Sequence, residues 1–324
     1  MKIGVVGAGA VGGYYGGKLC RYGADVHLLL RGDFEAVNAN GLKIQSPKGD
    51  FVIYPHAHET PETIGECDLV LVCLKTTAND RFAELVTPLV GKATTILCLQ
   101  NGLGNCEQLG KLFLPKNIMG GLCFVCLNRL APGVVRHIAF GKIVLGEYAG
   151  PPRERTTTIA EMFNAAGVPC SVADNLEEGR WEKLVWNIPF NGLGVAAVAG
   201  LDALESAGQK MPAPSGSAMS TDQLLADPKW EKWVREIMRE IVAVAHAKGL
   251  KIDSELPGKM IESTRAMGEY CASTQSDFER GQPLELESLF REPLRQARAT
   301  GVPLPRLESL CVVLEKLSGY CLHP

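Results

Sequence analysis

The chain has 324 residues, of which 46% are hydrophobic and 21% are charged, a composition typical of a folded protein of about two domains. Its formal net charge of −3 argues against a nucleic-acid-binding protein, because such proteins need a basic surplus to contact phosphates. No uncharged apolar run reaches the roughly 18 residues of a membrane span, and the first apolar stretch lacks a signal-peptide pattern, so we expect a cytoplasmic protein without membrane contact.

Strands and helices alternate in the first half of the sequence. Strands are predicted at 2–7, 25–30, 67–74, 94–99, 118–127, 133–138, 142–147 and 168–173. Helices are predicted at 13–22, 79–90, 106–114 and 155–166, with an extra hairpin at 42–54. This alternation is typical of a mostly parallel, doubly wound α/β sheet. We therefore predict a Rossmann-type domain over residues 1–173.

The second half of the chain is helical in pattern. Asp227-Pro228 begins a helix with one apolar face, because Pro is tolerated at the first position of a helix. Further helices are predicted at 261–277, 286–300 and 306–318. We expect an all-helical domain over residues 174–324.

Two features of the helical half bear on dynamics and assembly. Residues 206–220 are rich in Pro, Ser and Gly, which predicts a mobile loop. The apolar face with Trp230 and Trp233 packs either within one chain or between two, so a homodimer stays open.

A glycine motif, Gly7-Ala8-Gly9-Ala10-Val11-Gly12, joins the first predicted strand to the first helix. In this context Gly7 allows a tight turn, Gly9 lets backbone N–H groups approach a pyrophosphate, and Gly12 lets the helix pack closely on the sheet. The helix N-terminus also attracts phosphate charge. A tight turn without a ligand is the alternative, but the position favours a dinucleotide site.

Arg31 ends the second predicted strand. Folds that bind NAD usually have an acid there for the ribose 2′-hydroxyl, whereas an arginine suits the 2′-phosphate of NADP. Asp33, two residues on, is an alternative ribose contact. The sequence thus favours NADP, with a solvated surface arginine as the other interpretation.

Lys75 and Asn101 each follow a predicted strand of the sheet. Open α/β sheets bind ligands at the carboxyl ends of their strands, so both residues are candidates for a site. From position alone, a surface lysine and an ordinary turn are equally good interpretations.

The eleven cysteines predict no metal site. Cys123-Phe-Val-Cys126 is the one CxxC pair, and it has neither a second pair nor a nearby histidine to complete a zinc site. Because it lies in an apolar run, we expect a buried strand there and reduced thiols throughout.

Three polar residues recur at intervals of four in an apolar helical segment: Lys183, Asn187 and Asn191. A step of four residues turns a helix by about 40°, so the three share one face. Burying such side chains is costly unless they serve a purpose, although an ordinary exposed helix face gives the same pattern. Pro189 lies between the two asparagines and predicts a kink.

Taken together, these residues resemble the 2-dehydropantoate 2-reductase (ketopantoate reductase) family over nearly the whole chain. The motifs that carry the resemblance are GAGAVG at 7–12, Arg31, Leu-Lys75, Gln-Asn101-Gly-Leu-Gly, the helix with Lys183, Asn187 and Asn191, Ser273-x-x-x-Asp277, Glu285 and Gly301-Val-Pro-Leu-Pro. Alone, the segments around Ser273 and Glu285 indicate only a helix end and solvated acids.

The resemblance implies NADPH-dependent reduction of a small 2-oxo acid, 2-dehydropantoate, to (R)-pantoate in pantothenate synthesis. It implies that Lys183 donates the proton, and that Asn101, Asn187, Asn191 and Ser273 bind the substrate. The cofactor contacts that it implies are Gly7, Ala8, Gly9, Ala10, Val11, Gly12, Arg31, Lys75, Asn101, Cys126 and Glu285.

The sequence departs from the family pattern at three positions. Ala78, followed by Asn79, stands where the family often has Gln; Cys126 stands where it often has Ala; and Tyr270 stands where an Asn can precede Ser273. These changes leave a reductase of another 2-oxo or branched substrate as an alternative. A non-catalytic NADP(H)-binding regulator is the third interpretation, against which the polar row at Lys183 argues.

Overall fold

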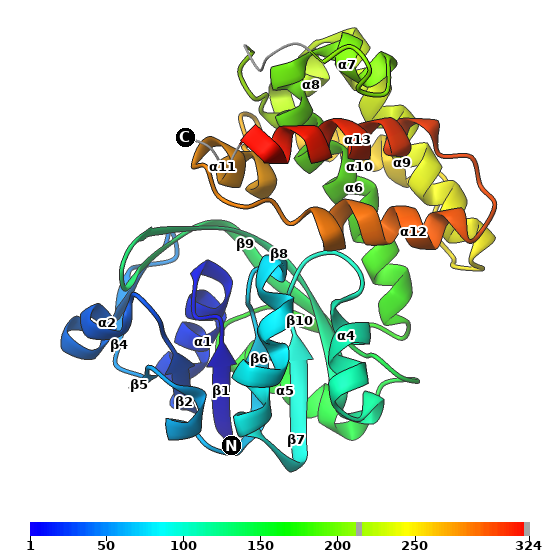
Figure 1. The fold of residues 1–324 in the computed structure, drawn as a ribbon. Coiled ribbons are helices and arrows are strands. Elements are labelled where there is room, and N and C mark those ends of the chain that lie inside the picture. The colour runs from blue at the N-terminus through cyan, green and yellow to red at the C-terminus, as the bar shows by residue number, and fades with distance from the viewer. Residues whose placement is uncertain (212–215, 321–324) are drawn as a thin grey trace. The chain divides into compact units, whose positions relative to one another are not determined.

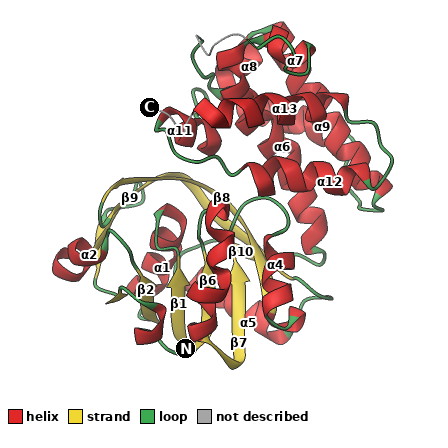
Figure 2. Cartoon of the chain, viewed as in Figure 1, coloured by secondary structure: helices red, strands yellow, loops and turns green. Residues whose placement is uncertain are grey.

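The computed structural model describes residues 1–211 and 216–320 and divides into two compact units, Met1–Leu176 and Glu177–Pro324 (Figure 1). The sequence placed the boundary at residue 173. Figure 2 shows the strands gathered in the first unit, while every regular element described in the second is a helix.

The first unit contains a ten-stranded mixed sheet. Its strands are β1 (Lys2–Val6), β2 (Asp25–Leu29), β3 (Leu42–Gln45), β4 (Phe51–Ile53), β5 (His56–His58), β6 (Cys67–Val72), β7 (Val90–Cys98), β8 (Ile118–Ala131), β9 (Val134–Glu147) and β10 (Cys170–Val172). Their order is β4-β3-β9-β8-β7-β6-β1-β2-β5, with β10 paired to β9. The strands β5-β2-β1-β6-β7-β8 pair in parallel, whereas β8 with β9 and β3 with β4 are antiparallel.

Both faces of the parallel sheet are buried. Ile3 and Val5 of β1 point into one apolar core and Val6 points into another, as expected for a strand covered on both sides. The helices of this unit are α1 (Ala10–Tyr22), α2 (Phe34–Asn40), α3 (Phe82–Val86), α4 (Asn105–Leu112) and α5 (Glu154–Ala165). The predicted Rossmann-type doubly wound sheet, followed by a helical region, is confirmed.

Several elements of the first unit differ from the prediction. Residues 133–147 form the single strand β9 rather than two strands, because Phe140 and Gly141 adopt positive φ angles of 64° and 118° within a bulge that the ladder absorbs. The helix predicted at 79–90 is only the short helix α3, with the 3-10 segments Thr76–Arg81 before it and Thr87–Leu89 after it, and Val90 already belongs to β7. The sequence did not indicate α2 or β5.

The second unit is built from α6 (Leu176–Ala196), α7 (Leu201–Glu205), α8 (Thr221–Ala226), α9 (Pro228–Ala247), α10 (Leu256–Arg265), α11 (Ser273–Glu279), α12 (Glu292–Arg298) and α13 (Pro305–Tyr320). The helix predicted at 261–277 is two helices, α10 and α11, because Gly268 turns the chain with a φ of +68°. Helix α9 begins at Pro228 as expected, and the Asp227 carboxylate caps it by accepting hydrogen bonds from two backbone N–H groups. None of the described helices is long and apolar enough to cross a membrane.

Helix α6 packs closely within this unit. A Cβ atom on Gly192 would lie 2.6 Å from Leu310 and 2.8 Å from Phe290, so only glycine permits this approach to α13. The Trp186 indole N–H donates to the Thr264 hydroxyl of α10 over 2.9 Å. Trp230 and Trp233 of α9 are buried in the same unit, so the apolar face that left a homodimer open is covered within the chain.

Of the loop predicted at 206–220, residues 212–215 lie outside the described residues. Its two flanks are held by hydrogen bonds. The Lys316 ammonium donates to Gly208 O over 2.7 Å, and Met219 N donates to Gly194 O over 2.9 Å.

Candidate active site

The glycine motif and three predicted site residues lie at one edge of the first unit's sheet. The motif follows β1, Arg31 follows β2, Lys75 follows β6 and Asn101 follows β7. Because these four strands are parallel neighbours, their carboxyl ends share an edge. The structure therefore brings together residues that the sequence could only place on separate strands.

Gly7 makes the closest backbone contact of this edge. Its φ is +92°, and a Cβ atom there would lie 2.4 Å from Leu74 N and 2.6 Å from Cys73 C. Both the angle and the clearance require glycine. The turn after β1 is thus pressed directly against the end of β6.

Gly9 and Gly12 have opposite surroundings. A Cβ atom on Gly12 would meet Gly7 O at 2.4 Å and the Val5 side chain at 2.9 Å, so this glycine permits α1 to pack against the sheet. Apart from its two chain neighbours, no atom of residues 1–211 and 216–320 would lie within 4 Å of a Cβ atom on Gly9. No side chain caps the N-terminus of α1, whose first turn carries no acid. Open space at uncapped N–H groups fits a pyrophosphate.

Arg31 and Asp33 differ in their partners. The Arg31 side chain is exposed and has no hydrogen bond or ion pair among residues 1–211 and 216–320. The Asp33 carboxylate is buried, accepts from both Arg129 Nε, at 2.9 Å, and Arg129 Nη2, and lies 3.4 Å from Gly133 N. Asp33 is therefore occupied by β8 and the following turn, while the Arg31 guanidinium is available to a phosphate.

A chain of side-chain amides ties the ends of β6 and β7 to the loop of Asn101. The Gln100 amide donates to Leu74 O over 2.9 Å and to Asn79 Oδ1 over 2.8 Å. Asn79 in turn donates to Asn105 Oδ1, and Asn105 donates to Asn101 O, both over 2.8 Å. Gln100 belongs to the Gln-Asn101-Gly-Leu-Gly motif and Asn79 to the departures from the family pattern, whereas nothing in the sequence singled out Asn105. The amides of Asn79, Gln100 and Asn105 together hold the Asn101 backbone in place.

Cys126 lies on the far part of β8. Gly120 of this strand pairs with Cys98, the last residue of β7, so β8 runs on beyond the carboxyl end of β7 before reaching Cys126. Cys123 and Cys126 are both buried and unbridged. The buried strand expected for the CxxC pair is confirmed.

The predicted row on α6 is present in the second unit. Lys183 is half-buried, while Asn187 and Asn191 are buried with 7% and 3% of their surfaces exposed. The helix continues through Pro189, which cannot donate to the carbonyl one turn back. The helix thus carries a lysine and two amides in register, as the sequence predicted.

The two asparagines of this row have different partners. Asn191 Oδ1 accepts from Ser273 Oγ at 3.2 Å and from Thr274 N at 3.0 Å, and Asn191 Nδ2 donates to Asn187 O over 2.9 Å. Asn191 therefore anchors the first turn of α11 and fixes Ser273, which is exposed. The side-chain amide of Asn187 makes no hydrogen bond within the part of the chain that the structure describes. Asn187 has free donors and an acceptor for a ligand.

Glu285 lies at the entry to an unusual turn. It is buried, and the segment Glu287–Arg291 that follows is a π-helix leading into α12. Such wide turns are frequent at functional sites because they re-aim neighbouring side chains. Glu285 accordingly has a defined position in the second unit.

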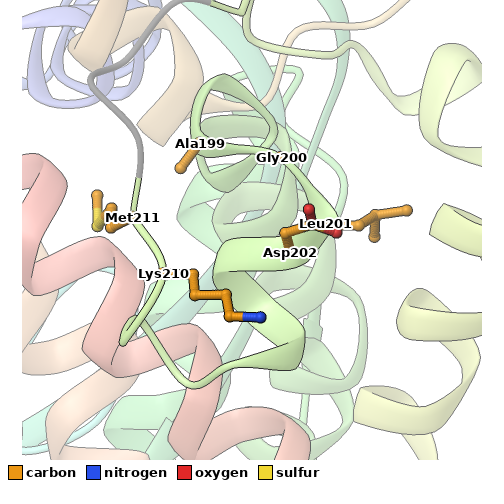
Figure 3. A pocket seen from close by; sticks show the side chains of 6 residues that line it. All are labelled: Ala199, Gly200, Leu201, Asp202, Lys210 and Met211. Carbon is orange, nitrogen blue, oxygen red and sulfur yellow. The ribbon is translucent and has the colours of Figure 1, made fainter.

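A separate shallow pocket in the second unit does not include the predicted site residues (Figure 3). Asp202 at the start of α7 and Lys210 in the loop after it lie on its wall. Ala199, Gly200, Leu201 and Met211 complete the lining.

Two parts of the chain match models of a known protein family. Residues 3–150 match the family model described as ketopantoate reductase PanE/ApbA, and residues 217–318 match its C-terminal counterpart. The chain is 37% identical to a 2-dehydropantoate 2-reductase of Nostoc sp., over 98% of this chain and 95% of that protein.

The fold of the chain is also similar to that of several solved structures. A 2-dehydropantoate 2-reductase of Geobacter metallireducens is 46% identical and superposes with a TM-score of 0.88, covering 98% of this chain and 99% of that one. A D-mandelate dehydrogenase with NADH and anilino(oxo)acetate, at 19% identity, shares the fold with a TM-score of 0.81, covering 99% of this chain and all of that one.

The glycine motif supplies a matched pair of variants. Gly9→Ala should keep the melting temperature of the wild type but lower affinity for a dinucleotide roughly ten- to a hundredfold, because the added methyl group would keep a phosphate from one backbone N–H and so cost a hydrogen bond to a charged group. Gly12→Ala should instead destabilise the protein by about 1–3 kcal/mol through overpacking. Thermal unfolding and cofactor titration of both variants separate the effects; equal loss of stability would contradict the open space at Gly9.

The amide chain predicts a positioning role for Asn79. Asn79→Ala leaves the buried Asn105 carbonyl oxygen without its donor, which costs about 1–3 kcal/mol and loosens the Asn101 loop. We expect a fall in kcat/KM of roughly tenfold or more, with dinucleotide affinity largely retained. Thr77→Ala, an exposed neighbour, is the control. Equal kinetics in the two variants would remove Asn79 from this role.

Proposed function

We propose that this chain, which belongs to the ketopantoate reductase family, reduces 2-dehydropantoate to (R)-pantoate with NADPH. The observation that carries the proposal is the polar row of α6, where a half-buried lysine lies in register with a buried side-chain amide that has no hydrogen-bond partner among the described residues. A lysine and an amide on one helix face can supply a proton and orient an oxygen substituent. The family match extends this interpretation over both units.

NADPH, rather than NADH, is the cofactor of this proposal. Arg31 is exposed and unpaired among the described residues, whereas Asp33, the alternative ribose contact, is bound to Arg129 and Gly133 N. A guanidinium fits the dianionic 2′-phosphate, and the remaining carboxylate is not available for a 2′-hydroxyl. The open space at Gly9 and the uncapped start of α1 support binding of the pyrophosphate.

The proton and the substrate orientation come from the second unit in this mechanism. Bound NADPH supplies a hydride to the 2-oxo carbon. The Lys183 ammonium stabilises the negative charge that grows on the oxygen and gives it a proton, leaving a neutral amine that solvent reprotonates. Asn187 offers a free amide to the substrate's carboxylate or hydroxyl. Asn191 holds Ser273 in position, and Asn101 and Glu285 complete the proposed contacts.

A reductase of a bulkier 2-oxo acid is the second candidate. Tyr270 lies three residues before Ser273, and its ring centroid is 6.1 Å from that of Trp186 on α6. Two aromatic rings near the proposed substrate contacts favour an apolar substituent on the substrate.

The cytoplasmic location is part of the proposal. All ten cysteines that the structure describes are free thiols. Unbridged cysteines in this number fit a reducing compartment. The tryptophan face that suggested a homodimer is buried within the chain.

Loss of NADPH absorbance with a panel of 2-oxo acids tests the function. We expect 2-dehydropantoate to give the highest kcat/KM, and phenyl-substituted 2-oxo acids to lead if the second candidate holds. No turnover with any 2-oxo acid, by protein that binds NADPH, would overturn both and favour a regulator.

The Arg31 guanidinium should set cofactor preference. Arg31→Ala is expected to reduce the preference for NADPH over NADH roughly ten- to a hundredfold, since a hydrogen bond to a charged group contributes about 1.5–3 kcal/mol. Asp33→Asn, the matched control, should lower the melting temperature through its Arg129 contact but leave the preference unchanged. Equal losses for both cofactors in Arg31→Ala would refute the assignment.

Lys183 is the residue expected to matter most for the chemical step. Lys183→Ala should lower kcat by roughly 10²–10⁴, the usual contribution of a positioned acid, with NADPH affinity nearly unchanged. Lys183→Arg should not rescue it, because a guanidinium does not release a proton near neutral pH. Ketone reduction should slow in alkaline solution, where the ammonium is lost, while alcohol oxidation should speed up.

Steady-state kinetics decide between an acid and a mere anchor at Lys183. An anchor for the substrate carboxylate predicts a raised KM with kcat retained. Lys251→Ala, an exposed lysine of the same unit, is the control and should match the wild type. A kcat within a few-fold of wild type in Lys183→Ala would leave Glu285 as the next candidate.

A further inference from the structure

Three of the chain's six histidines gather at one edge of the first unit's sheet. His27 lies on β2, and His56 and His58 lie on β5, the short edge strand that pairs with β2 in parallel (Figure 1). Asp25 at the start of β2 completes the group. The cysteine pattern predicted no metal site, and nothing in the sequence indicated the short strand β5 that carries two of these histidines.

We propose that Asp25, His27 and His56 bind a divalent transition-metal ion, for which Zn²⁺ is the natural probe. His27 Nε2 lies 3.1 Å from Asp25 Oδ1, and His56 Nε2 lies 3.4 Å from the same oxygen. All three ligand atoms lie within 4.8 Å of one another. Tetrahedral zinc with bonds of about 2.0–2.2 Å places neighbouring ligand atoms about 3.3–3.6 Å apart, so small shifts suffice.

A second layer of hydrogen bonds orients His27 for this role. His27 Nδ1 lies 2.9 Å from His58 Nε2, and His58 Nδ1 lies 2.9 Å from Thr63 Oγ1. The Thr63 hydroxyl donates to Thr60 O over 2.8 Å. With a metal on Nε2, His27 carries its proton on Nδ1, and each member of this chain then has one donor and one acceptor. Metal-bound histidines commonly have such a partner on the second ring nitrogen.

The site is open on one side. The His27 side chain is 13% exposed, whereas those of Asp25 and His56 are 51% and 66% exposed. A metal can therefore enter from solvent, and a water can fill the fourth position. The nearby Lys2 is already engaged, since its backbone N–H donates to Asp68 and its ammonium to Ile64 O.

A bound metal would tie β5 to β2 at the edge of the sheet. β5 has three residues, and its His58 O accepts a bond from Leu30 N, the residue directly before Arg31. A metal bridge across the two strands would therefore stiffen the strand end that carries Arg31. The site is structural and does not depend on the proposed reaction.

Zinc titration of chelator-treated protein without an affinity tag tests the proposal. Cys271→Ser serves as the background, because Cys271 is the exposed thiol among the described cysteines. We expect one zinc per chain, a higher melting temperature with zinc, and no such effect of Mg²⁺, which prefers oxygen ligands. Cobalt should give a spectrum without a thiolate charge-transfer band.

His56→Ala and Asp25→Asn are the test variants, and Glu161→Gln, an exposed acid on α5, is the control. Each test variant should weaken zinc binding at least tenfold and abolish the thermal shift, while the control binds like the background. Thr63→Val should weaken binding roughly 10–100-fold through the second layer. Unchanged binding in His56→Ala, a thiolate spectrum, or no binding by the background protein would overturn the site. NADPH binding in each variant reports that the domain is folded.

Discussion

The contact between the Gly7 turn and the end of β6 is the constraint on which the first unit depends. With 2.4 Å between a notional Cβ and Leu74 N, any side chain at Gly7 would push the glycine loop away from the strand. Gly12 imposes the same restriction on the other side of the loop, where α1 meets β1. Between these contacts, Gly9 is left with open space. The loop is thus fixed by packing on both flanks and open only where a phosphate is expected to bind.

In the second unit, the candidate residues Asn187 and Asn191 are buried polar groups. Burying a side-chain amide lowers the stability of the fold unless the amide is hydrogen-bonded. The amide oxygen of Asn191 accepts a hydrogen bond from Thr274 N, in the first turn of α11. Its contact with Ser273 makes the position of an exposed hydroxyl depend on a buried side chain. Asn187, one turn away, lacks such partners in the described chain. One helix face therefore combines an anchor with an available amide.

The sequence predicted the elements with strong periodicity and the motifs with special residues. The alternating strands, the glycine loop and the register of Lys183 were found because each depends on local pattern. The predictions from sequence were wrong or missing for elements whose form depends on tertiary contacts. The bulge at Phe140 joins two predicted strands because β8 pairs across it, and β5 is too short to have a pattern of its own.

The hydrogen-bond partners of individual side chains could not be predicted from the sequence either. The amide chain from Gln100 to Asn105 links residues from separate segments, and no spacing rule predicts it. The histidine group at the sheet edge forms for the same reason, since His27 and His56 meet only through strand pairing. The roles of Asn191 and Asp33 likewise depend on such contacts, because their residue types alone left several roles open.

The bond between Asp33 and Arg129 limits how cofactor choice can change by mutation. Asp33 sits near the strand end where an acid would be needed for NADH, yet its carboxylate supports the turn at Gly133. Releasing the Asp33 carboxylate for a ribose would break its contacts with Arg129 and Gly133, which connect distant parts of the domain. A change of preference from NADPH to NADH would therefore require a new acidic residue at position 31. NADH binding would then depend on a newly introduced carboxylate, because Asp33 is already needed for the structure of the domain.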